Sequence, residues 1–383
     1  MTVMLSILSE IKKLRGSDAP LSVDLSNTNR YRVVINETDR TKTAYYFSTP
    51  IYNNITKKTI SMKFYESDDG INYIGSNAKI KISDNMRFEN EGGSFSIALN
   101  EKAMMTNEQE ILVGNNKIYP TLNGIAYLVD CSVEKGFSFV ISTDSPYTDI
   151  RSNDKYFSLM KNKFEPFFTV SCIGTTNSKG EISAPAKIHY QKISHTQYIL
   201  SVRPCTPLYN SVLLEINMYE NKLFQDTTVE SNNPCANNVF GSVAFIGNTN
   251  EYGEQWLYSR LDFSILSDLL NKKIQNATIH IPVLNKSNVI LKAHKVSSRF
   301  CSFGSNWDNK IPIAEPITSS DISKDYQNID ITSLLTDEHG MLKLSDGLIL
   351  RTKIKNTGFT AISTGDSYYA PQILEVRCYS ENN

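Results

Sequence analysis

Residues 65–73, YESDDGINY, decide the fold class of this chain. They place the pair Asp69-Gly70 between two β-type runs, and the positive φ angles of a tight hairpin turn favour that pair. A calcium-binding loop is the alternative, but the spaced oxygen ligands and the closing glutamate of such a loop are missing. The stretch therefore predicts two antiparallel strands joined by a short turn.

Much of the remaining sequence repeats this pattern of short β-type runs separated by Gly, Asn, Asp and Ser. Several runs alternate apolar with polar residues, which buries one face of a strand and exposes the other. The pairs Lys179-Gly180 and Gly92-Gly93 suggest two further chain reversals. Because almost no convincing helix separates the runs, they predict antiparallel sheets and not βαβ units. Such runs cover residues 31–36, 59–65, 78–83, 94–99, 137–142, 166–172, 198–203 and 211–219.

The first residues form an amphipathic pattern and not an export signal. No Lys or Arg precedes the apolar run, Glu10 interrupts it, and no small-residue cleavage site is evident. We therefore expect one helix, ended by Gly16, that packs either on its own domain or on a neighbouring subunit. The apolar positions at helical spacing are Met4, Ile7, Leu8, Ile11 and Leu14.

The length of 383 residues exceeds the usual size of one domain, so we expect two, each with its own core. Pro204 and Pro207 would stop the run that precedes them and mark a boundary. The expected fold is mainly β, with two antiparallel, jelly-roll-like β-sandwich domains after a short N-terminal amphipathic helix. The helix occupies residues 1–16, an attachment or assembly domain residues 17–205, and the second sandwich residues 206–383.

Charge and hydropathy exclude two classes of partner. The formal net charge is only -1, so no overall attraction to nucleic acid or to an anionic membrane is expected. No apolar stretch is long enough to span a bilayer. We therefore expect neither a nucleic-acid partner nor membrane insertion.

The residue types that serve catalysis and metal binding are scattered. No C-x-x-C pair and no suitably spaced histidine forms a zinc site, and the cysteines are expected to be reduced core or surface residues, which suits synthesis in a cytoplasm. His280 and His294 lie in β-type runs, where a hydrogen-bonded sheet residue is the common case. No G-x-S-x-G, H-E-x-x-H or phosphate-binding glycine motif is present. We expect no enzyme activity, no metal and no cofactor. The cysteines are Cys131, Cys172, Cys205, Cys235, Cys301 and Cys378.

The second half of the chain carries six short motifs in a fixed order. They lie at residues 226–229 with Gly241 and Gly247, and at residues 257–263, 274–279, 306–312, 330–332 and 363–374. Over about residues 212–379, this order resembles the DNRLRE-type domain, which is related to the disaggregatase repeat and to family 96 carbohydrate-binding modules. The resemblance implies a β-sandwich that serves as an accessory module and not as a catalyst.

One of these motifs, GSNWDNKIP at residues 304–312, places Trp307 among turn-forming polar residues. In the family, this tryptophan belongs to a long excursion between strands, which implies that Trp307 covers one end of the sandwich. Asn306, Asp308 and Asn309 would then satisfy backbone groups of the turn through their side chains. The alternative is an exposed platform on which a sugar ring stacks.

Four other aromatic residues are candidates for a carbohydrate site. Tyr252 and Trp256 lie in NEYGEQWLY, and Tyr368 and Tyr369 lie in the polar loop GDSYYAP. Loops of β-sandwiches are common recognition surfaces, and aromatic rings stack on sugar faces with little loss of entropy. Packing at the rim of the sandwich explains the same residues without a ligand.

The resemblance also suggests a biological setting. DNRLRE-like domains occur in cell-surface proteins and in tail-region proteins of bacterial viruses and phage-derived particles. We therefore expect a non-catalytic structural component of a phage or phage-tail-like particle, in its baseplate, fibre or collar region. It would be made in the bacterial cytoplasm without a signal peptide, would assemble with other particle subunits and as a homo-oligomer, and would face cell-surface polysaccharide in the virion or extracellular particle. The alternatives are a carbohydrate-binding surface or secreted protein, and a polysaccharide-degrading enzyme within the first half.

Overall fold

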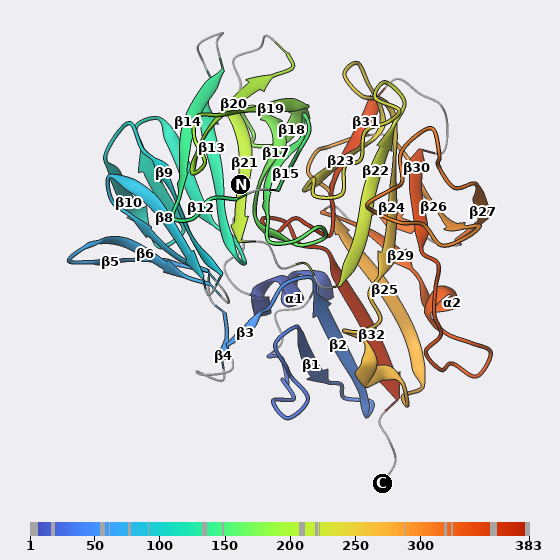
Figure 1. The fold of residues 1–383 in the computed structure, drawn as a ribbon. Helices are drawn as coiled ribbons and strands as arrows, with labels where there is room; N and C mark the ends of the chain where they lie inside the picture. Colours follow the sequence, from blue (N-terminus) through green and yellow to red (C-terminus); the bar gives the residue numbers. More distant parts are fainter. Residues whose placement is uncertain are drawn as a thin grey trace. The chain divides into compact units, whose positions relative to one another are not determined.

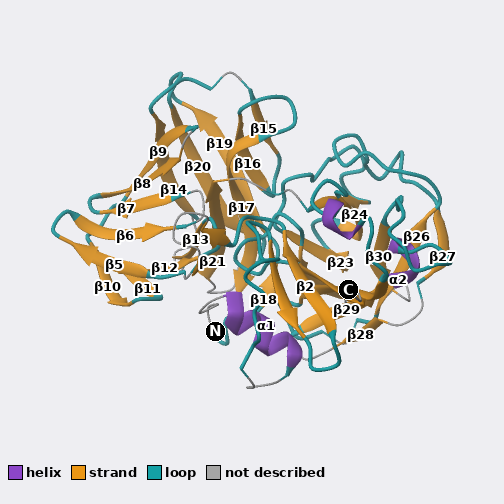
Figure 2. Cartoon of the chain, turned by 90° about the horizontal axis from the view of Figure 1, so that it is seen from below, coloured by secondary structure: helices purple, strands orange, loops and turns teal. Residues whose placement is uncertain are grey.

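The fold is mainly β, as the sequence predicts (Figure 1). All strand pairs with a defined register are antiparallel, and strands dominate over the short helices α1 (Ile7–Arg15) and α2 (Thr332–Leu335) (Figure 2). The computed structural model describes residues 7–16, 20–53, 58–60, 62–75, 78–90, 92–131, 136–147, 149–206, 211–218, 221, 223–287, 289–317, 320–322, 325–352 and 358–379.

The chain forms two compact units. They are not separated by the single boundary expected between residues 205 and 206, because each unit contains several segments of the chain. Unit 1 consists of Met1–Glu10, Thr59–Tyr219 and Phe240–Ser242, and unit 2 consists of Ile11–Lys58, Glu220–Val239 and Val243–Asn383. Most of unit 1 is therefore an insertion between two parts of unit 2. The physical reason is strand pairing, because strands far apart in the sequence share one sheet of unit 2.

That sheet of unit 2 joins both ends of the chain. Over the described residues it has six strands in the order β1-β2-β32-β25-β29-β28. Strand β2 pairs with β32 from Thr41 opposite Tyr379 to Phe47 opposite Ile373. The N-terminal hairpin therefore completes the sheet of the C-terminal strand. The strands are β1 (Arg32–Asn36), β2 (Thr41–Phe47), β32 (Ile373–Tyr379), β25 (Ile274–Pro282), β29 (Tyr326–Asp330) and β28 (Ser320–Ile322).

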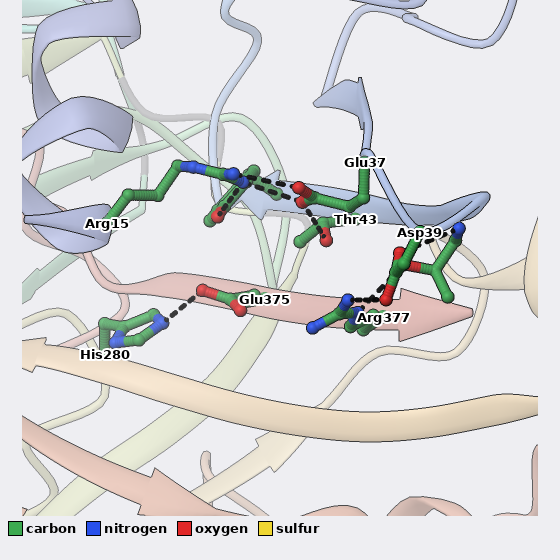
Figure 3. Close-up of polar contacts among 9 residues, drawn as sticks. Arg15, Glu37, Asp39, Thr43, His280, Glu375 and Arg377 are labelled. Carbon is green, nitrogen blue, oxygen red and sulfur yellow. Dashed lines mark hydrogen bonds and ion pairs between the residues drawn. The ribbon is translucent and has the colours of Figure 1, made fainter. Parts of the chain in front are cut away.

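Polar side chains reinforce this junction (Figure 3). The Arg15 guanidinium donates two hydrogen bonds to the Glu37 carboxylate, at 2.7 and 2.9 Å, and the pKa of Glu37 is lowered mainly for that reason. Arg377 on β32 forms an ion pair with Asp39 in the turn between β1 and β2. The hairpin of β1 and β2 thus belongs structurally with the C-terminal strand.

The second sheet of unit 2 has seven strands over the described residues. Its order is β27-β26-β30-β24-β23-β31, with β22 paired to β24. Leu257 and Leu350 face the core between the two sheets, whereas their neighbours Tyr258 and Ile349 face outward and belong to a second cluster. The strands are β22 (Phe224–Glu230), β23 (Val243–Thr249), β24 (Gly253–Leu261), β26 (Leu291–Val296), β27 (Ile313–Pro316), β30 (Leu348–Thr352) and β31 (Gly358–Ser363).

Unit 1 is a second sandwich, whose two sheets pack through aromatic rings. Phe95 of one sheet stacks on Phe168 of the other at 4.0 Å between ring centroids, and Phe157 contacts Tyr198 at 5.5 Å. One sheet has the order β10-β11-β12-β13-β21-β17-β16-β15, with β18 paired to β17, and the other has the order β19-β20-β14-β9-β8-β7-β6-β5.

The strands of the first of these sheets are β10 (Ala103–Asn107), β11 (Glu110–Val113), β12 (Asn116–Pro120), β13 (Gly124–Asp130), β15 (Ile150–Ser152), β16 (Tyr156–Met160), β17 (Pro166–Thr176), β18 (Ile182–Ala184) and β21 (Ser211–Met218). Those of the second are β5 (Phe64–Ser67), β6 (Gly70–Ile74), β7 (Lys79–Ile82), β8 (Asn85–Asn90), β9 (Gly93–Ala98), β14 (Phe137–Thr143), β19 (Ala186–Lys192) and β20 (Gln197–Pro204). A short pair, β3 (Tyr52–Asn53) and β4 (Lys58–Thr59), lies outside both. Strand β21, which the resemblance includes, pairs with β13 and β17 of unit 1.

The predicted local features are largely confirmed. Strands β5 and β6 form the hairpin expected at Asp69-Gly70, and Gly70 has a φ of 131°. A Cβ at Gly70 would lie 2.7 Å from the carbonyl oxygen of Ile82, so this position requires glycine. The helix ends at Gly16 as predicted, whereas Met4 lies outside the described residues. Ile7 and Ile11 are fully buried, so the helix packs on its own chain.

Candidate functional site

The turn around Trp307 is held by two asparagines that bond to each other. The Asn306 backbone N–H donates to Asn309 Oδ1 at 2.8 Å, and the Asn309 N–H donates to Asn306 Oδ1 at 3.1 Å. Asn309 Nδ2 also donates to the carbonyl oxygen of Gly304 at 2.9 Å. The predicted role of these two asparagines is confirmed. Asp308 differs, because its carboxylate accepts a hydrogen bond from the Cys235 thiol at 3.6 Å.

A second loop, which follows β22, fixes this turn from outside. The Trp307 N–H donates to the carbonyl oxygen of Pro234 at 2.9 Å. Asn237 Nδ2 donates to the carbonyl oxygens of Ser302 and Ser305 at 2.6 and 3.0 Å. Two irregular segments therefore satisfy each other's backbone groups, which holds the indole in a defined position.

Trp307 covers the outer face of the seven-stranded sheet, whereas the resemblance implied one end of the sandwich. Trp307 and Trp256 pack against a cluster that includes Tyr258 and Ile349, which point away from the main core. The Tyr258 hydroxyl donates to the carbonyl oxygen of Ile311 at 2.9 Å, which ties the same loop to β24. The correction follows from strand alternation, because β24 has an apolar residue on each face.

The two tryptophans of the chain form one surface. Their ring centroids lie 5.3 Å apart at an interplanar angle of 58°, and both side chains are half-buried. Lys310 Nζ lies 4.2 Å from the Trp307 ring centroid and donates to the Trp307 carbonyl oxygen at 3.1 Å. Trp256 Nε1 donates to Glu254 Oε1 at 2.9 Å. We call Glu254, Trp256, Trp307 and Lys310 the tryptophan surface.

This surface combines two kinds of recognition chemistry. Half-exposed indole faces contact apolar C–H groups, and the nearby ammonium and carboxylate groups exchange hydrogen bonds with hydroxyl groups. The ammonium of Lys310 already interacts with the indole face of Trp307. A ligand with a flat apolar face and a hydroxylated edge, such as a sugar ring, therefore matches the surface.

Two of the predicted aromatic residues lie elsewhere. Tyr252 and Tyr368 have no exposed surface, so neither can stack on a ligand, and the expected site is corrected for both. Tyr252 packs near Phe245, at 6.2 Å between ring centroids. Tyr369 is half-buried in the loop after β31. Of the four candidates, only Trp256 belongs to the tryptophan surface, and its partner is the residue that the sequence favoured as a structural plug.

Burial of Tyr368 follows from how its loop folds. The Gly365 N–H donates to Asp226 Oδ2 at 2.6 Å, and Gln372 Nε2 donates to the carbonyl oxygen of Ser363 at 2.8 Å. Burial raises the pKa of Asp226 to about 7. A segment that reads as a polar loop is therefore held inside by a buried carboxyl group and a buried amide.

The histidines with sheet positions behave as expected. His280 Nε2 lies 3.0 Å from Glu375 Oε2 (Figure 3). His280 Nδ1 lies 2.9 Å from Asn328 Oδ1. For His294, desolvation lowers the pKa. Cys131, Cys172 and Cys378 are buried, and Cys235 and Cys301 are exposed.

Within the described ranges, no group of three or more His, Cys, Asp or Glu side chains is placed to hold a metal ion. No helix in the same ranges has the length and apolar character needed to cross a bilayer. No protein-family model matches the chain, and no curated protein matches it significantly.

Proposed function

We propose that this protein is a non-catalytic structural component of a phage or phage-tail-like particle, and that its tryptophan surface binds cell-envelope polysaccharide. The observation that carries the proposal is the contact between Trp256 and Trp307 on the outer face of the seven-stranded sheet. Both rings are partly buried against apolar neighbours and keep some exposed surface. Tryptophan and tyrosine are enriched at recognition surfaces.

The surface requires little ordering when a ligand binds. Trp256 is on β24, and hydrogen bonds to Pro234 and Tyr258 hold the loop that carries Trp307. Preorganised side chains lose little entropy on binding. Pairs of aromatic rings contribute about 0.5–1.5 kcal/mol beyond their buried area. We expect an indole–sugar contact to be of the same order, so a single site should bind weakly. Many copies on one particle would raise the affinity through multivalency.

The resemblance to DNRLRE-type domains is consistent with the particle setting, because such domains occur as accessory modules in tail-region proteins as well as in cell-surface proteins. A carbohydrate-binding surface or secreted protein would use the same tryptophan surface and is the alternative. The helix α1 does not favour either setting, since Ile7 and Ile11 are buried within this chain. Particles released by the bacterium that makes the chain, labelled with an antibody against it and viewed by electron microscopy, would separate the two. Labelling of particles supports the first proposal, and labelling of cell walls alone contradicts it.

The binding proposal is tested by affinity electrophoresis of the purified protein through gels that contain cell-wall polysaccharide. We expect the polysaccharide to retard the wild-type protein in the gel. The variants Trp256→Ala and Trp307→Ala should each lose most of this retardation. Phe164→Ala is the matched control, because Phe164 is 57% exposed and belongs to unit 1, whereas the tryptophan surface belongs to unit 2.

Loss of binding must be separated from loss of folding. Lys310→Met keeps both indole rings and removes the ammonium, so it should alter retardation without changing the thermal unfolding midpoint by more than a few degrees. The proposal is contradicted if both tryptophan variants, shown to be folded by circular dichroism, bind as strongly as the wild type.

A further inference from the structure

A groove in unit 1 is lined by residues of the edge strands of its two sheets. Strand β5 ends one sheet and β10 ends the other, and no other strand in the described ranges pairs with either outer edge. The cavity has a volume of about 870 Å³, and its lining includes residues of β5, β6, β10 and β11. Unpaired backbone groups of two strands are therefore available at one place.

The two edges meet at one end of the groove. The Phe64 N–H donates to the carbonyl oxygen of Glu108 at 2.8 Å, and Gln109 Nε2 donates to the carbonyl oxygen of Met62 at 2.9 Å. Beyond this junction the lining is formed by Ser67 at the end of β5 and Ala103 at the start of β10. The groove thus opens where the two strands no longer share hydrogen bonds.

The strand β10 has one of the features that protect a sheet edge, a register irregularity between Met105 and Asn107 where it pairs with β11, but it lacks two others. Its sequence, AMMTN, contains no charged residue and no proline, and Met104 is 59% exposed. Exposed sheet edges usually carry charges, prolines or bulges that prevent a further strand from pairing. A flexible methionine on such an edge adapts to varied apolar side chains.

The lining has an apolar floor and an acidic rim. Ile71 and Ile82 are buried at the floor, and the rim carries the carboxylates of Glu66, Asp68, Asp69 and Asp84 against the single ammonium of Lys102. The Asp69 carboxylate forms an ion pair with Lys81 at 2.6 Å, which leaves three carboxylates and one ammonium facing the groove. The excess of negative charge favours a cationic ligand.

We propose that this groove binds an extended, positively charged polypeptide segment of another protein, which adds as a strand to the edge of β10. Addition of a strand to a sheet edge draws affinity from backbone hydrogen bonds and specificity from alternate side chains. Apolar side chains on one face reach the isoleucine floor, and basic side chains on the other reach Glu66, Asp68 and Asp84. The five residues of β10 set the length of the paired segment.

Fluorescence anisotropy of labelled peptides with the full chain tests the proposal. A hexapeptide that alternates Lys and Val should bind, and the same pattern with Glu should not. Raising the salt concentration from 50 to 500 mM should weaken binding at least tenfold, because exposed charges are screened. Equal binding of both peptides would overturn the proposal.

Charge variants locate the site. The double variant Asp68→Asn, Asp84→Asn removes two exposed carboxylates and should reduce the affinity for the Lys–Val peptide at least fivefold. Glu165→Gln is the matched control, since it removes one carboxylate in the turn between β16 and β17. These strands lie in the same sheet as β10, near its opposite edge. A control that weakens binding as much as the double variant would overturn the assignment to the groove.

Backbone pairing is tested by two versions of the peptide, each methylated at alternate backbone nitrogens in one of the two possible frames. At least one frame should lose binding at least tenfold, while keeping every side chain and charge. If both frames bind as the unmodified peptide does, strand addition is wrong. Analytical ultracentrifugation provides the last test. If the chain binds no peptide but self-associates, and Met104→Lys abolishes that self-association, then the edge of β10 binds a second copy of the chain and the proposal of a foreign segment is wrong.

Discussion

At the residue scale, Asp226 connects folding to pH. Its carboxyl group is buried in β22 and accepts the Gly365 N–H, which holds the loop that contains Tyr368. Desolvation raises its pKa from the ordinary 3.8 to about 7. The folded state therefore binds this proton more tightly than the unfolded chain does. The protonated carboxyl stabilises the fold fully below about pH 4, and this stabilisation is lost as the pH rises through about 7.

We therefore predict that Asp226→Asn flattens the pH dependence of stability between pH 4 and pH 8. The amide can still accept the Gly365 N–H but cannot ionise. The variant should have a higher thermal midpoint than the wild type at pH 8, and the difference should shrink at pH 5. Calorimetry at both pH values measures it, and a variant that is less stable than the wild type at pH 8 would contradict the assigned cause.

The site residues could be predicted only in part, because the type of a residue does not determine whether its side chain is exposed to solvent. Trp307 and its asparagines were found from the turn-forming sequence around them, and their mutual hydrogen bonds followed from side-chain chemistry. Tyr368 lies in an equally polar stretch but is buried, because its loop donates a hydrogen bond from Gly365 to the buried carboxylate of Asp226. Asp226 is more than a hundred residues away in the sequence, so the local pattern does not reveal this contact. The contact between Trp256 and Trp307 could not be predicted, because it depends on long-range strand pairing that no local sequence pattern specifies.

At the element scale, the turn between β1 and β2 contains strain. Arg40 has a φ of 63°, the left-handed region that side chains with a Cβ avoid, and its side chain is exposed. The turn is needed, because it joins β1 to β2, and β2 pairs with β32 along its whole length. The hairpin therefore pays a local cost for closing the six-stranded sheet.

Arg40→Gly should remove this strain and stabilise the protein by about 0.5–1 kcal/mol. Arg40→Ala is the matched control, because it removes the same side-chain atoms beyond Cβ but keeps the strained backbone. Its stability should lie within about 0.5 kcal/mol of the wild type. Urea unfolding measures both, and equal stabilities of the Gly and Ala variants would show that the backbone conformation is not the cause.

Strand positions could be predicted from the sequence more completely than strand partners. The runs at residues 137–142 and 198–203 became β14 and β20 with shifts of one residue at their ends. The expected run at residues 59–65 is divided between β4 and β5, because a pattern of alternation does not reveal where pairing stops. Pairing of β2 with β32 joins residues more than three hundred positions apart, and no turn residue or local alternation encodes such a contact.

At the scale of the whole molecule, unit 2 depends on both ends of the chain. A fragment of residues 206–383 lacks β1 and β2, so it would expose the edge of β32, and it would carry β21 without its partners in unit 1. Exposed edges of this kind promote aggregation. Residues 59–219 contain both sheets of unit 1 without interruption.

We predict that the fragment of residues 59–219 unfolds cooperatively, whereas the fragment of residues 206–383 is insoluble or unfolded. Circular dichroism and size-exclusion chromatography of both fragments check this. Cooperative folding of residues 206–383 at the stability of the full chain would contradict the role assigned to the N-terminal hairpin.

The central functional claim is that carbohydrate binds at the tryptophan surface, and the chain offers a direct measurement of it. Only two tryptophans are present, so a spectrum of protein labelled with ¹⁵N at the indole nitrogens contains two side-chain signals. Addition of fragments of cell-wall polysaccharide should shift both signals together and saturably, because Trp256 and Trp307 pack against each other. Fragments that bind the protein while both indole signals stay in place would contradict the claim.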